Sequence, residues 1–484
     1  MSNPQQSSTG AIAIVTPLNV VAGAVVTAAN AITCPVLIYG VSDDDSGGVL
    51  ILQNGATVSG PIAFFGGGGE FHDLSGVAGA YQFYGGGGVI RLSAAGASAT
   101  IANTDGQWDN VYGAAITVTL NNGEANVYGG GNLVSFAQGS TNAVSLHGAA
   151  SQWNTVVGTM GVATVDGGSA SFVGGGDVIN AAAGSWLSLY DTNGVADIVD
   201  ANSAFVILNG VEAQVRGGGD SIILSAPSTV TLSGGNGSWD SVVGNGATVH
   251  INGVNVAIVG SGETVTAAAG TWVTLYDTTS AADSVSASGA HIIVETASAA
   301  ITGGGNEIFT VGSCTISLSG TAGHWDVVRG SGAEIAVTSA QVSVVGGDDA
   351  ITASASSISL YSTAGQADTV SGAHDSLALV GAEAQLQGAY DSVYFSGASA
   401  LTVSGSNEAF YFGAALGRSS IAGFNASDKL HFSATDWASY NALMASGDVI
   451  QSGADTVIRL DGSNALTLTN TRASSLGASQ FVFS

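Results

Sequence analysis

A run of glycines followed by an acidic residue recurs along this chain, and it is the pattern with the clearest chemical meaning. Gly174-Gly175-Gly176-Asp177 returns as Gly217-Gly218-Gly219-Asp220, and Gly346-Gly347 precede Asp348-Asp349. Carboxylate oxygens beside turns with accessible backbone carbonyls are typical ligands of calcium. We therefore take Asp177, Asp220, Asp348 and Asp349 as candidate calcium ligands, with Asp348 and Asp349 the best single site.

The same positions also have a structural interpretation. Carboxylates stacked in successive turns of chain repel by roughly 1 kcal/mol or more per pair at a surface, so hydrogen bonds or a cation must offset the charge. Asn132, Asn154 and Asn306 stand where other copies have aspartate. Asparagine accepts the backbone N–H bonds of an Asx-type turn at its own corner but carries no charge. This exchange favours a structural turn for the columns as a whole and leaves calcium as the alternative.

The glycine-acidic pattern belongs to a long repeat. The acidic or amide residue of this pattern recurs at positions 177, 220, 263, 306 and 349, in steps of 43 residues. A fixed period of this size is typical of repeat proteins, in which each unit buries its apolar face only against its neighbours.

Apolar residues alternate with polar ones within each repeat, which is typical of a half-buried strand. Val144 and Leu146 flank Ser145, and equivalent pairs follow at steps of 43 or 42 residues: Leu187 and Leu189, Val230 and Leu232, Val273 and Leu275, Ile316 and Leu318, Ile358 and Leu360. A second Asp/Asn column lies midway between the glycine runs, which predicts two coils per repeat of about 23 and 20 residues. We expect an all-β fold: a right-handed parallel β-solenoid (β-helix or β-roll-like) of about 43-residue two-coil repeats with a small C-terminal β-rich cap.

The polar residues between the apolar pairs should point outward. They are Ser145, Ser188, Thr231, Thr274, Ser317 and Ser359, and we expect them to form one Ser/Thr stripe. Tryptophans recur with a longer period of 86 residues, with Trp153, Trp239 and Trp325 in one series and Trp186 and Trp272 in another. Small residues at the intervening copies favour packing, with large side chains over small ones, rather than a sugar-binding aromatic row.

Composition limits the functions that this chain can have. Seven Lys and Arg against 35 Asp and Glu give a net charge of −28, so we expect no nucleic-acid partner and no binding to anionic lipid through a basic patch. With 72 Gly but only 5 Pro the chain is not collagen-like. Cys34 and Cys314 are far apart, and Cys314 lies in a column with Ser185, Ser228 and Thr271, which favours free thiols. The apolar N-terminal stretch lacks a cationic flank, so neither a Sec signal nor membrane insertion is expected.

These features divide the chain into three expected segments. Residues 1–40 are an N-terminal cap or first coil, residues 41–408 the repetitive solenoid, and residues 409–484 a C-terminal region. In that last region, residues 433–444 predict a short helix that begins near Thr435 or Asp436. Three strand-like runs follow it, at 455–460, 465–468 and 480–484.

The C-terminal region resembles the end of type I secreted RTX proteins, including the serralysin-like proteases. The likeness rests on residues 421–432 (Ile-Ala-Gly-Phe-Asn-Ala-Ser-Asp-Lys-Leu-His-Phe), 453–460 (Gly-Ala-Asp-Thr-Val-Ile-Arg-Leu) and 476–483 (Leu-Gly-Ala-Ser-Gln-Phe-Val-Phe). In that family the tail follows a Gly/Asp-rich β-roll and is an uncleaved export signal read by a type I secretion apparatus. The resemblance therefore implies export.

The upstream repeats are RTX-like with two departures. The RTX consensus Gly-Gly-x-Gly-x-Asp-x-U-x places Ca²⁺ between turns. Here no residue separates the last glycine from Asp177, and the period is 43 rather than a multiple of nine. The family thus implies calcium as a cofactor, while its ligand pattern is not reproduced residue by residue.

No catalytic constellation stands out in the sequence. There is no His-Glu-x-x-His pattern and no nucleophile elbow with a credible triad. The nearest approach to a site is Arg329 beside Asp326 and His324, a grouping more typical of an exposed charge cluster. We do not expect an enzyme.

The sequence leads to one main functional hypothesis and two alternatives. The main hypothesis is a secreted extracellular or cell-surface structural protein that assembles with itself, end to end or laterally, into a matrix fibre, biofilm scaffold or surface layer. Extracellular polysaccharide is a further expected partner. The alternatives are an adhesin that binds carbohydrate or ice, and a polysaccharide-modifying enzyme on a β-helix.

Overall fold

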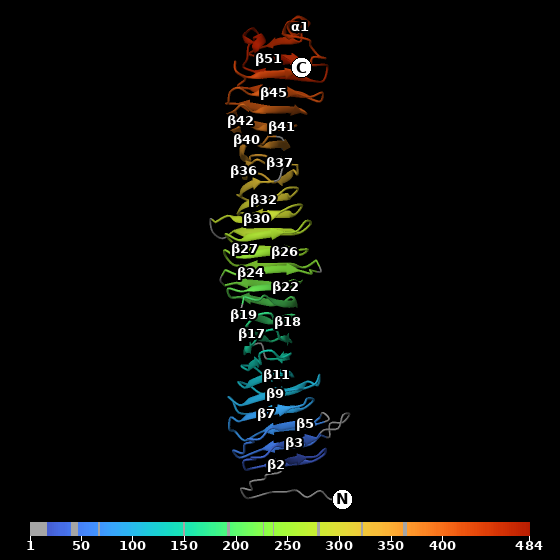
Figure 1. Ribbon diagram of the computed structural model, residues 1–484. Coiled ribbons are helices and arrows are strands. Elements are labelled where there is room, and N and C mark those ends of the chain that lie inside the picture. Colours follow the sequence, from blue (N-terminus) through green and yellow to red (C-terminus); the bar gives the residue numbers. More distant parts are fainter. Residues whose placement is uncertain are drawn as a thin grey trace. The chain divides into compact units, whose positions relative to one another are not determined.

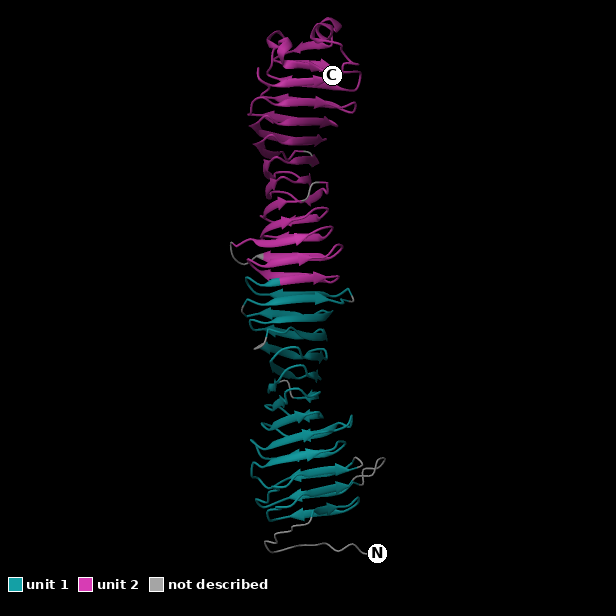
Figure 2. Ribbon diagram, viewed as in Figure 1, with its two compact units in different colours: residues 1–248 teal, residues 249–484 magenta. Residues whose placement is uncertain are grey.

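The computed structural model describes residues 17–39, 47–65, 68–148, 151–190, 194–225, 227–235, 237–277, 281–320, 323–361 and 365–484. The chain divides into two compact units, residues 1–248 and 249–484 (Figure 2). Each unit is almost entirely β-structure, and each is described separately below.

Unit 1 holds short strands that alternate between two parallel sheets, sheet A and sheet B (Figure 1). Its sheet A strands are β1 (Leu18–Val20), β3 (Val36–Tyr39), β5 (Ile62–Phe65), β7 (Ala80–Tyr84), β9 (Ser98–Ala102), β11 (Thr117–Asn121), β13 (Leu133–Phe136), β15 (Asn154–Val157), β17 (Ser169–Val173), β19 (Trp186–Tyr190), β21 (Phe205–Leu208), β23 (Ser221–Leu224) and β25 (Trp239–Val243). Its sheet B strands are β2 (Val25–Ala28), β4 (Val49–Leu52), β6 (Glu70–Asp73), β8 (Val89–Leu92), β10 (Asp109–Tyr112), β12 (Glu124–Tyr128), β14 (Ala143–His147), β16 (Val162–Val165), β18 (Val178–Ala181), β20 (Asp197–Asn202), β22 (Glu212–Gly218) and β24 (Thr229–Ser233).

The unit boundary falls in β26 (Thr248–Asn252), and unit 2 continues the same alternation. Its sheet A strands are β27 (Asn255–Gly260), β29 (Trp272–Asp277), β31 (His291–Glu295), β33 (Glu307–Val311), β35 (Asp326–Arg329), β37 (Gln341–Val345), β39 (Ser357–Tyr361), β41 (Ser376–Val380), β43 (Ser392–Ser396), β45 (Ala409–Phe412), β47 (Lys429–Phe432) and β51 (Phe481–Phe483). Its sheet B strands are β28 (Thr264–Ala267), β30 (Asp283–Ala287), β32 (Ser298–Thr302), β34 (Thr315–Ser319), β36 (Glu334–Thr338), β38 (Ala350–Ser354), β40 (Asp368–Ala373), β42 (Glu383–Ala389), β44 (Ala400–Val403), β46 (Arg418–Ala422), β48 (Val449–Ser452), β49 (Asp455–Arg459) and β50 (Ala465–Thr469).

One strand of each sheet makes one coil, and, outside the C-terminal cap, strands pair in parallel with the strand two places along the chain. Val178 lies beside Ile198 in sheet B, for example, and Ser221 beside Ser241 in sheet A. Parallel strands spaced about 4.8 Å apart put equivalent residues of successive coils directly over one another. The predicted parallel β-solenoid is therefore confirmed.

The core lies between the two sheets of each unit and is filled by alternate residues of most strands. The predicted inward columns are confirmed: Val144, Leu187, Leu232 and Ile316 are among the residues with 0% exposure. Burial of one such aliphatic side chain contributes about 1.5–3 kcal/mol, so two inward residues per strand stabilise each coil against its neighbours.

The prediction of two coils per 43-residue repeat was wrong. Five strands separate equivalent positions, because Asp177 precedes β18 and Asp220 precedes β23. A coil of two strands needs only about 17 residues here, so one repeat spans two and a half coils. Successive copies therefore alternate between sheet B and sheet A, and the same sheet returns after 86 residues.

Because one repeat spans two and a half coils, equivalent residues return to the same sheet every second repeat, which explains the 86-residue tryptophan period. Trp239 begins β25, while Trp153 and Trp325 directly precede β15 and β35, so all three lie on sheet A. The same half-coil offset also divides the expected Ser/Thr stripe. Ser145 lies in β14 of sheet B and Ser188 in β19 of sheet A, so the predicted single stripe does not exist.

The ends of the solenoid differ in part from the expected segments. Residues 17–39 of the N-terminal segment form β1 to β3, which pair as ordinary coils; residues 1–16 and 40 lie outside the described ranges. Parallel stacking runs past residue 408, because Phe410, Ile421 and Leu430 keep the inward alternation without glycine runs.

The C-terminal cap of unit 2 is mixed β-structure. Strand β50 pairs in parallel with β46, and β49 and β48 follow in antiparallel order, while β51 pairs with β47. The three predicted strand runs are confirmed as β49, β50 and β51. Two 3-10 turns, η1 (Ala473–Ser475) and η2 (Ala478–Gln480), lie between β50 and β51.

The predicted helix in the cap is shorter than expected. Helix α1 covers Tyr440–Ser446, and its N-cap is Ser439 rather than Thr435 or Asp436. The Ser439 side chain accepts a hydrogen bond from the Ala442 N–H at 3.2 Å, and Gly447 ends the helix at φ 83°. Ser433 forms a local turn instead, with its backbone carbonyl accepting the Asp436 N–H.

Candidate functional site

The recurring acidic and amide residues lie two residues before an inward strand position, and their side chains are turned into the protein. Asp177 is 1% exposed and Asp220 is 2% exposed. We call such residues, stacked in successive coils, a carboxylate ladder.

Each ladder side chain binds the coil before it. The Oδ1 atom of Asp177 accepts the Gly161 N–H at 2.8 Å, and the N–H of Asp177 in turn donates to Asp197 Oδ1 at 2.9 Å. The same geometry recurs from Ala204 to Asp220 and Asp240, from Ala290 to Asn306 and Asp326, and from Ala333 to Asp349 and Asp368, at 2.8–3.1 Å. The N–H donors belong to the neighbouring coil. The expected Asx turn, in which each side chain accepts N–H groups of its own corner, was therefore wrong.

Asparagine can occupy the ladder because only one side-chain oxygen is needed. Asn132 Oδ1 accepts the Ile116 N–H at 3.1 Å, and the Asn132 N–H donates to Asn154 Oδ1 at 3.0 Å. The amide group of Asn132 also donates to the Gly113 carbonyl at 3.3 Å. The exchange of Asp for Asn therefore preserves the bond between coils.

The glycines before the ladder residues are required by the close approach of neighbouring coils. A Cβ on Gly174 would lie 1.7 Å from the Gly158 carbonyl oxygen, and one on Gly217 would lie 1.5 Å from that of Ala201. These glycines also have φ angles of +135° and +127°, which other residues avoid. The glycine run thus has a packing role that does not depend on a metal.

The second oxygen of several ladder carboxylates is buried without a hydrogen-bond partner. This holds for the Oδ2 atoms of Asp109, Asp220, Asp349 and Asp368. Burial raises the pKa of Asp177, Asp240 and Asp349 to about 6, and that of Asp109 and Asp368 to about 7, although backbone N–H bonds oppose the shift. The ladders consequently hold protons more tightly than exposed carboxylates do.

The structure separates most of the candidate calcium ligands. Asp177 lies before β18 in sheet B and Asp220 before β23 in sheet A, so they belong to different ladders. Asp348 is exposed with φ 66°, while its neighbour Asp349 is buried and already accepts the Ala333 N–H.

The oxygen atoms of the ladder side chains can be compared with the coordination shell that calcium requires. Across the residues that the structure describes, no group of three or more His, Cys, Asp and Glu side chains has an arrangement that could hold a metal ion. Calcium takes six to eight oxygen ligands, so a bound ion would need carbonyl oxygens or water beside the spare Oδ2 atoms.

The Arg329, Asp326 and His324 grouping is not assembled. Asp326 is buried and its Oδ1 accepts the Asn306 N–H, whereas Arg329 Nε donates to Glu307 Oε1 at 2.7 Å. Glu307 Oε2 also lies 3.2 Å from His291 Nδ1. The hydrogen bond from Arg329 lowers the pKa of Glu307. These partners come from β31, β33 and β35, and sequence reasoning missed them because they are a coil apart rather than adjacent in the chain.

Rings stack from coil to coil on the outer faces. Tyr112, Tyr128 and His147 form one such stack on sheet B of unit 1, with centroid distances of 4.5 and 4.6 Å, and the Arg91 guanidinium lies 4.3 Å from the Tyr112 centroid. The expectation of large side chains over small ones was wrong for the series of Trp186 and Trp272, because Trp186 stacks on Phe205 at 4.2 Å and Trp272 on His291 at 4.4 Å. The stacked faces cover one another, so ring edges and polar groups remain toward solvent.

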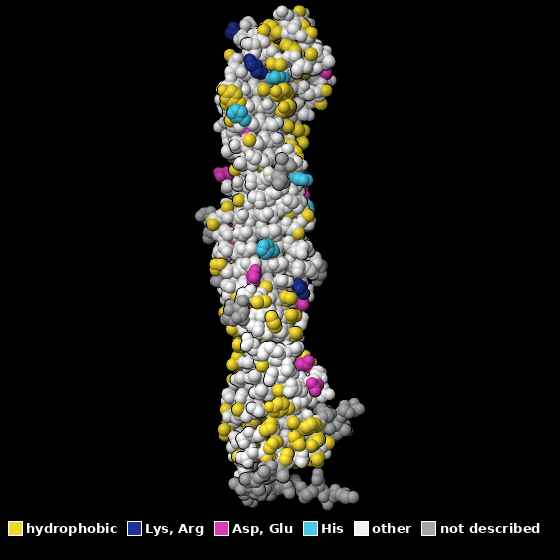
Figure 3. All heavy atoms as spheres, viewed as in Figure 1, with side chains coloured by type: hydrophobic (Ala, Val, Ile, Leu, Met, Phe, Trp, Pro, Cys, Tyr) yellow, Lys and Arg dark blue, Asp and Glu magenta, His cyan; other side chains and the backbone are white. Residues whose placement is uncertain are grey.

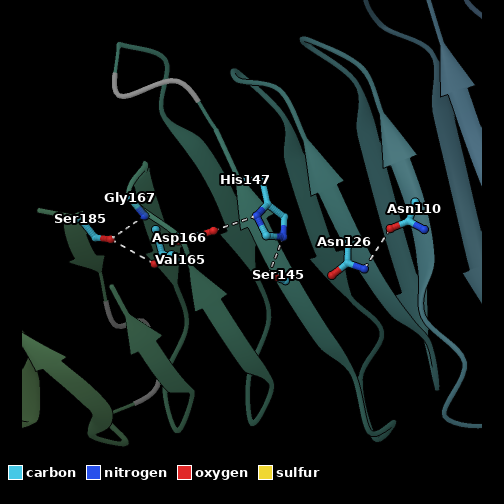
Figure 4. Close-up of polar contacts among 8 residues, drawn as sticks. All are labelled: Asn110, Asn126, Ser145, His147, Val165, Asp166, Gly167 and Ser185. Atoms are coloured by element: carbon cyan, nitrogen blue, oxygen red, sulfur yellow. Dashed lines mark hydrogen bonds and ion pairs between the residues drawn. The ribbon is translucent and has the colours of Figure 1, made fainter. Parts of the chain in front are cut away.

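Polar contacts run beside this stack (Figure 4). His147 contacts Asp166 Oδ2 at 3.3 Å through Nδ1 and Ser145 Oγ at 3.0 Å through Nε2. Asn126 donates to Asn110 Oδ1 at 3.1 Å. This face of unit 1 is therefore a mixed aromatic and polar surface.

The cysteines act as small buried residues. Cys34 and Cys314 are free thiols, as expected. Cys314 Sγ donates to the Val294 carbonyl at 3.0 Å, and the Ser185 hydroxyl makes the equivalent bond to the Val165 carbonyl at 3.1 Å. The thiol replaces a hydroxyl donor of the same column.

A second candidate surface lies on the outer face of sheet B in unit 2, and we call it the hydroxyl face. Its side chains are in register over seven strands, β28 to β40, and nearly all are Ser, Thr or Ala. They are Thr264, Thr266, Ser284, Ser286, Ser298, Ala300, Thr302, Thr315, Ser317, Ser319, Glu334, Ala336, Thr338, Ala350, Thr352, Ser354, Thr369 and Ser371. Glu334 is the one charged residue of this set.

No protein-family model matches this chain, and no curated protein is significantly similar to it in sequence. Within the described ranges, no helix has the length and apolar content needed to cross a bilayer.

Replacement of Asp220 by alanine should destabilise unit 1. The change removes the acceptor of the buried Ala204 N–H, which costs about 1–3 kcal/mol, whereas Asp220→Asn keeps the acceptor and should stay close to wild type. Urea unfolding followed by circular dichroism measures both, with Asp436→Ala on the exposed surface as the control. Equal losses from Asn and Ala would contradict the proposed role of the oxygen.

Calcium should act on the ladders in competition with protons. We expect millimolar calcium to raise the melting temperature at about pH 8, where more ladder carboxylates are ionised, and to have less effect at about pH 5. Isothermal calorimetry and melting curves with EGTA check this. If calorimetry gives no heat of binding and EGTA leaves the melting temperature unchanged, the ladders bind no calcium.

Proposed function

We propose that this protein is a secreted extracellular structural protein that assembles with copies of itself into a fibre, matrix scaffold or surface layer. The observation that carries the proposal is the hydroxyl face. On a chain with a net charge of −28, copies repel one another wherever acidic side chains are exposed. The hydroxyl face offers a nearly uncharged surface where two copies can approach.

The small side chains of this face also suit sheet-on-sheet packing. Stacked sheets lie about 10 Å apart, and short residues in register allow such an approach without steric conflict. The outer face of sheet A in the same unit differs, since it carries His291, Glu295, Glu307 and Arg329. Charged side chains are sparse on the side of the molecule drawn in Figure 3, which is consistent with assembly through uncharged surfaces.

Export through a type I apparatus is part of this proposal. The three stretches that resemble the RTX tail lie in the last coils and the cap of unit 2, including β47, β49 and β51. The resemblance implies an uncleaved export signal at this end of the sequence, and this implication supports the proposal. Calcium belongs to the proposal as the cation that could neutralise acidic surfaces between copies.

Electron microscopy of the purified full chain tests the assembly. We expect fibres, sheets or paired particles at high protein concentration, with and without calcium. Strictly monomeric particles under both conditions would exclude a self-assembling role.

Ice or ordered water is a second candidate ligand, and it is favoured by the paired hydroxyl columns. Residues such as Thr264 and Thr266, Ser284 and Ser286, and Thr352 and Ser354 present two hydroxyls per strand. Their spacings are about 4.8 Å between strands and about 6.6 Å along a strand. A regular flat array of this kind can order a water layer.

A thermal-hysteresis assay separates the two candidate functions. If the hydroxyl face binds ice, the wild-type protein should depress the freezing point, and Thr302→Glu with Thr338→Glu should abolish the effect. Ser343→Glu with Ser359→Glu adds the same charge to the outer face of sheet A and is the matched control. No hysteresis in the wild type would remove this candidate.

A further inference from the structure

The longest carboxylate ladder in the described part of unit 2 lies just before the cap. Asp375, Asp391, Glu408 and Asp428 directly precede β41, β43, β45 and β47, and they occupy the same register position of sheet A in four successive coils. None of the four side chains is more than 5% exposed. Four acidic groups are thus stacked inside the protein at the coil spacing of about 4.8 Å.

One oxygen of each group is used between coils. Asp375 Oδ1 accepts the Ser356 N–H at 2.8 Å, Asp391 Oδ1 the Asp375 N–H at 2.9 Å, Glu408 Oε2 the Asp391 N–H at 2.7 Å and Asp428 Oδ1 the Glu408 N–H at 3.1 Å. The other oxygens, Asp375 Oδ2, Asp391 Oδ2 and Glu408 Oε1, are buried without a hydrogen-bond partner. Asp428 Oδ2 differs, because it accepts the Asn425 N–H at 2.9 Å.

Few cationic groups lie near these oxygens. The titratable and charged groups on the elements packed around the ladder include His374, Tyr390, Tyr394, Tyr411, Lys429 and His431 on the side of sheet A, and Asp368, Glu383 and Arg418 on sheet B. Burial raises the pKa of Asp375 and Asp391, and the charge of His374 opposes this rise only weakly. Lys429 extends instead to the Ser479 carbonyl. Fully ionised, the ladder would therefore hold stacked buried charges with little compensation.

Burial and mutual repulsion act in the same direction. Burial and, to a smaller extent, the neighbouring Asp391 and Asp428 carboxylates together raise the pKa of Glu408 to about 7, although the Asp391 N–H bond opposes the shift; the pKa values of the other three members are also raised by burial. A carboxyl whose pKa is raised on folding favours the folded state most while it is protonated. That stability is lost as the pH rises from the unfolded pKa through the folded one.

We propose that Asp375, Asp391, Glu408 and Asp428 form a proton-operated clamp on the last coils of unit 2. Protons held on these carboxyl groups cancel the repulsion between coils. Their release to solvent as the pH rises from mildly acidic to mildly alkaline leaves stacked negative charges that loosen the coils that carry the cap. The clamp does not depend on self-assembly or on calcium.

Hydrogen exchange of the full chain, followed by mass spectrometry, tests the clamp. After correction for intrinsic exchange, peptides within residues 375–432 should be protected about tenfold more at about pH 5 than at about pH 8.5. Glu408→Gln removes a charge but keeps an oxygen for the Asp391 N–H. It should raise protection at the alkaline pH about tenfold and weaken the pH dependence, and Asp391→Asn should do the same.

The controls separate charge from hydrogen bonding. Asp436→Asn removes one exposed charge in the cap and should leave the pH dependence unchanged. Glu408→Ala removes the acceptor and should lower protection at both pH values. Protection that does not depend on pH in the wild type, or a loss of protection in Glu408→Gln at alkaline pH, would overturn the clamp.

A direct measurement covers the case in which the variants fail to fold. Infrared spectroscopy of the wild type at neutral pH should show the carbonyl band of protonated carboxyl groups, and this band should disappear on alkaline titration. Absence of the band at neutral pH would also overturn the proposal.

Discussion

The hydrogen bond from a backbone N–H to a carboxylate or amide oxygen of the next coil is the interaction on which the rest of this structure depends. It ties Gly161 to Asp177 and Ala204 to Asp220 at the corners, where the regular strand pairing ends. Because the side chain is short, it reaches only one coil away. Strands that begin at such a corner are held in register, and every column of the solenoid then stacks with like positions over one another.

Register has opposite consequences inside and outside. Inside, it stacks Val, Ile and Leu into continuous columns and also places acidic groups over acidic groups. Burial, and to a smaller extent the repulsion between neighbours, raises the pKa values of these carboxyl groups. Outside, it turns residues scattered in sequence into surfaces such as the hydroxyl face and the ring stack of Tyr112, Tyr128 and His147. The same register therefore stacks buried carboxyl groups, whose ionisation destabilises the fold, and creates the outer surfaces available for assembly.

The proposed function and the proposed clamp draw on different parts of this geometry. Assembly uses an outer face of sheet B where charge is nearly absent, while the clamp uses buried carboxyls of sheet A before the cap. A strongly acidic chain needs both arrangements, because exposed charge opposes association and buried charge opposes folding. Neither arrangement needs a catalytic centre.

The sequence by itself determined the strand periodicity, the inward columns, the parallel solenoid class and the strands of the cap. These follow from alternation and from a fixed repeat, which are local properties of the chain. Only the tertiary structure decided which residues become neighbours. A coil of about 17 residues does not divide a 43-residue repeat evenly, so Asp177 and Asp220 fall in different sheets and the Ser/Thr positions alternate with them. Contacts one coil away, such as Glu307 with Arg329 or Asp391 with Glu408, depend on that coil length, which no local pattern specifies.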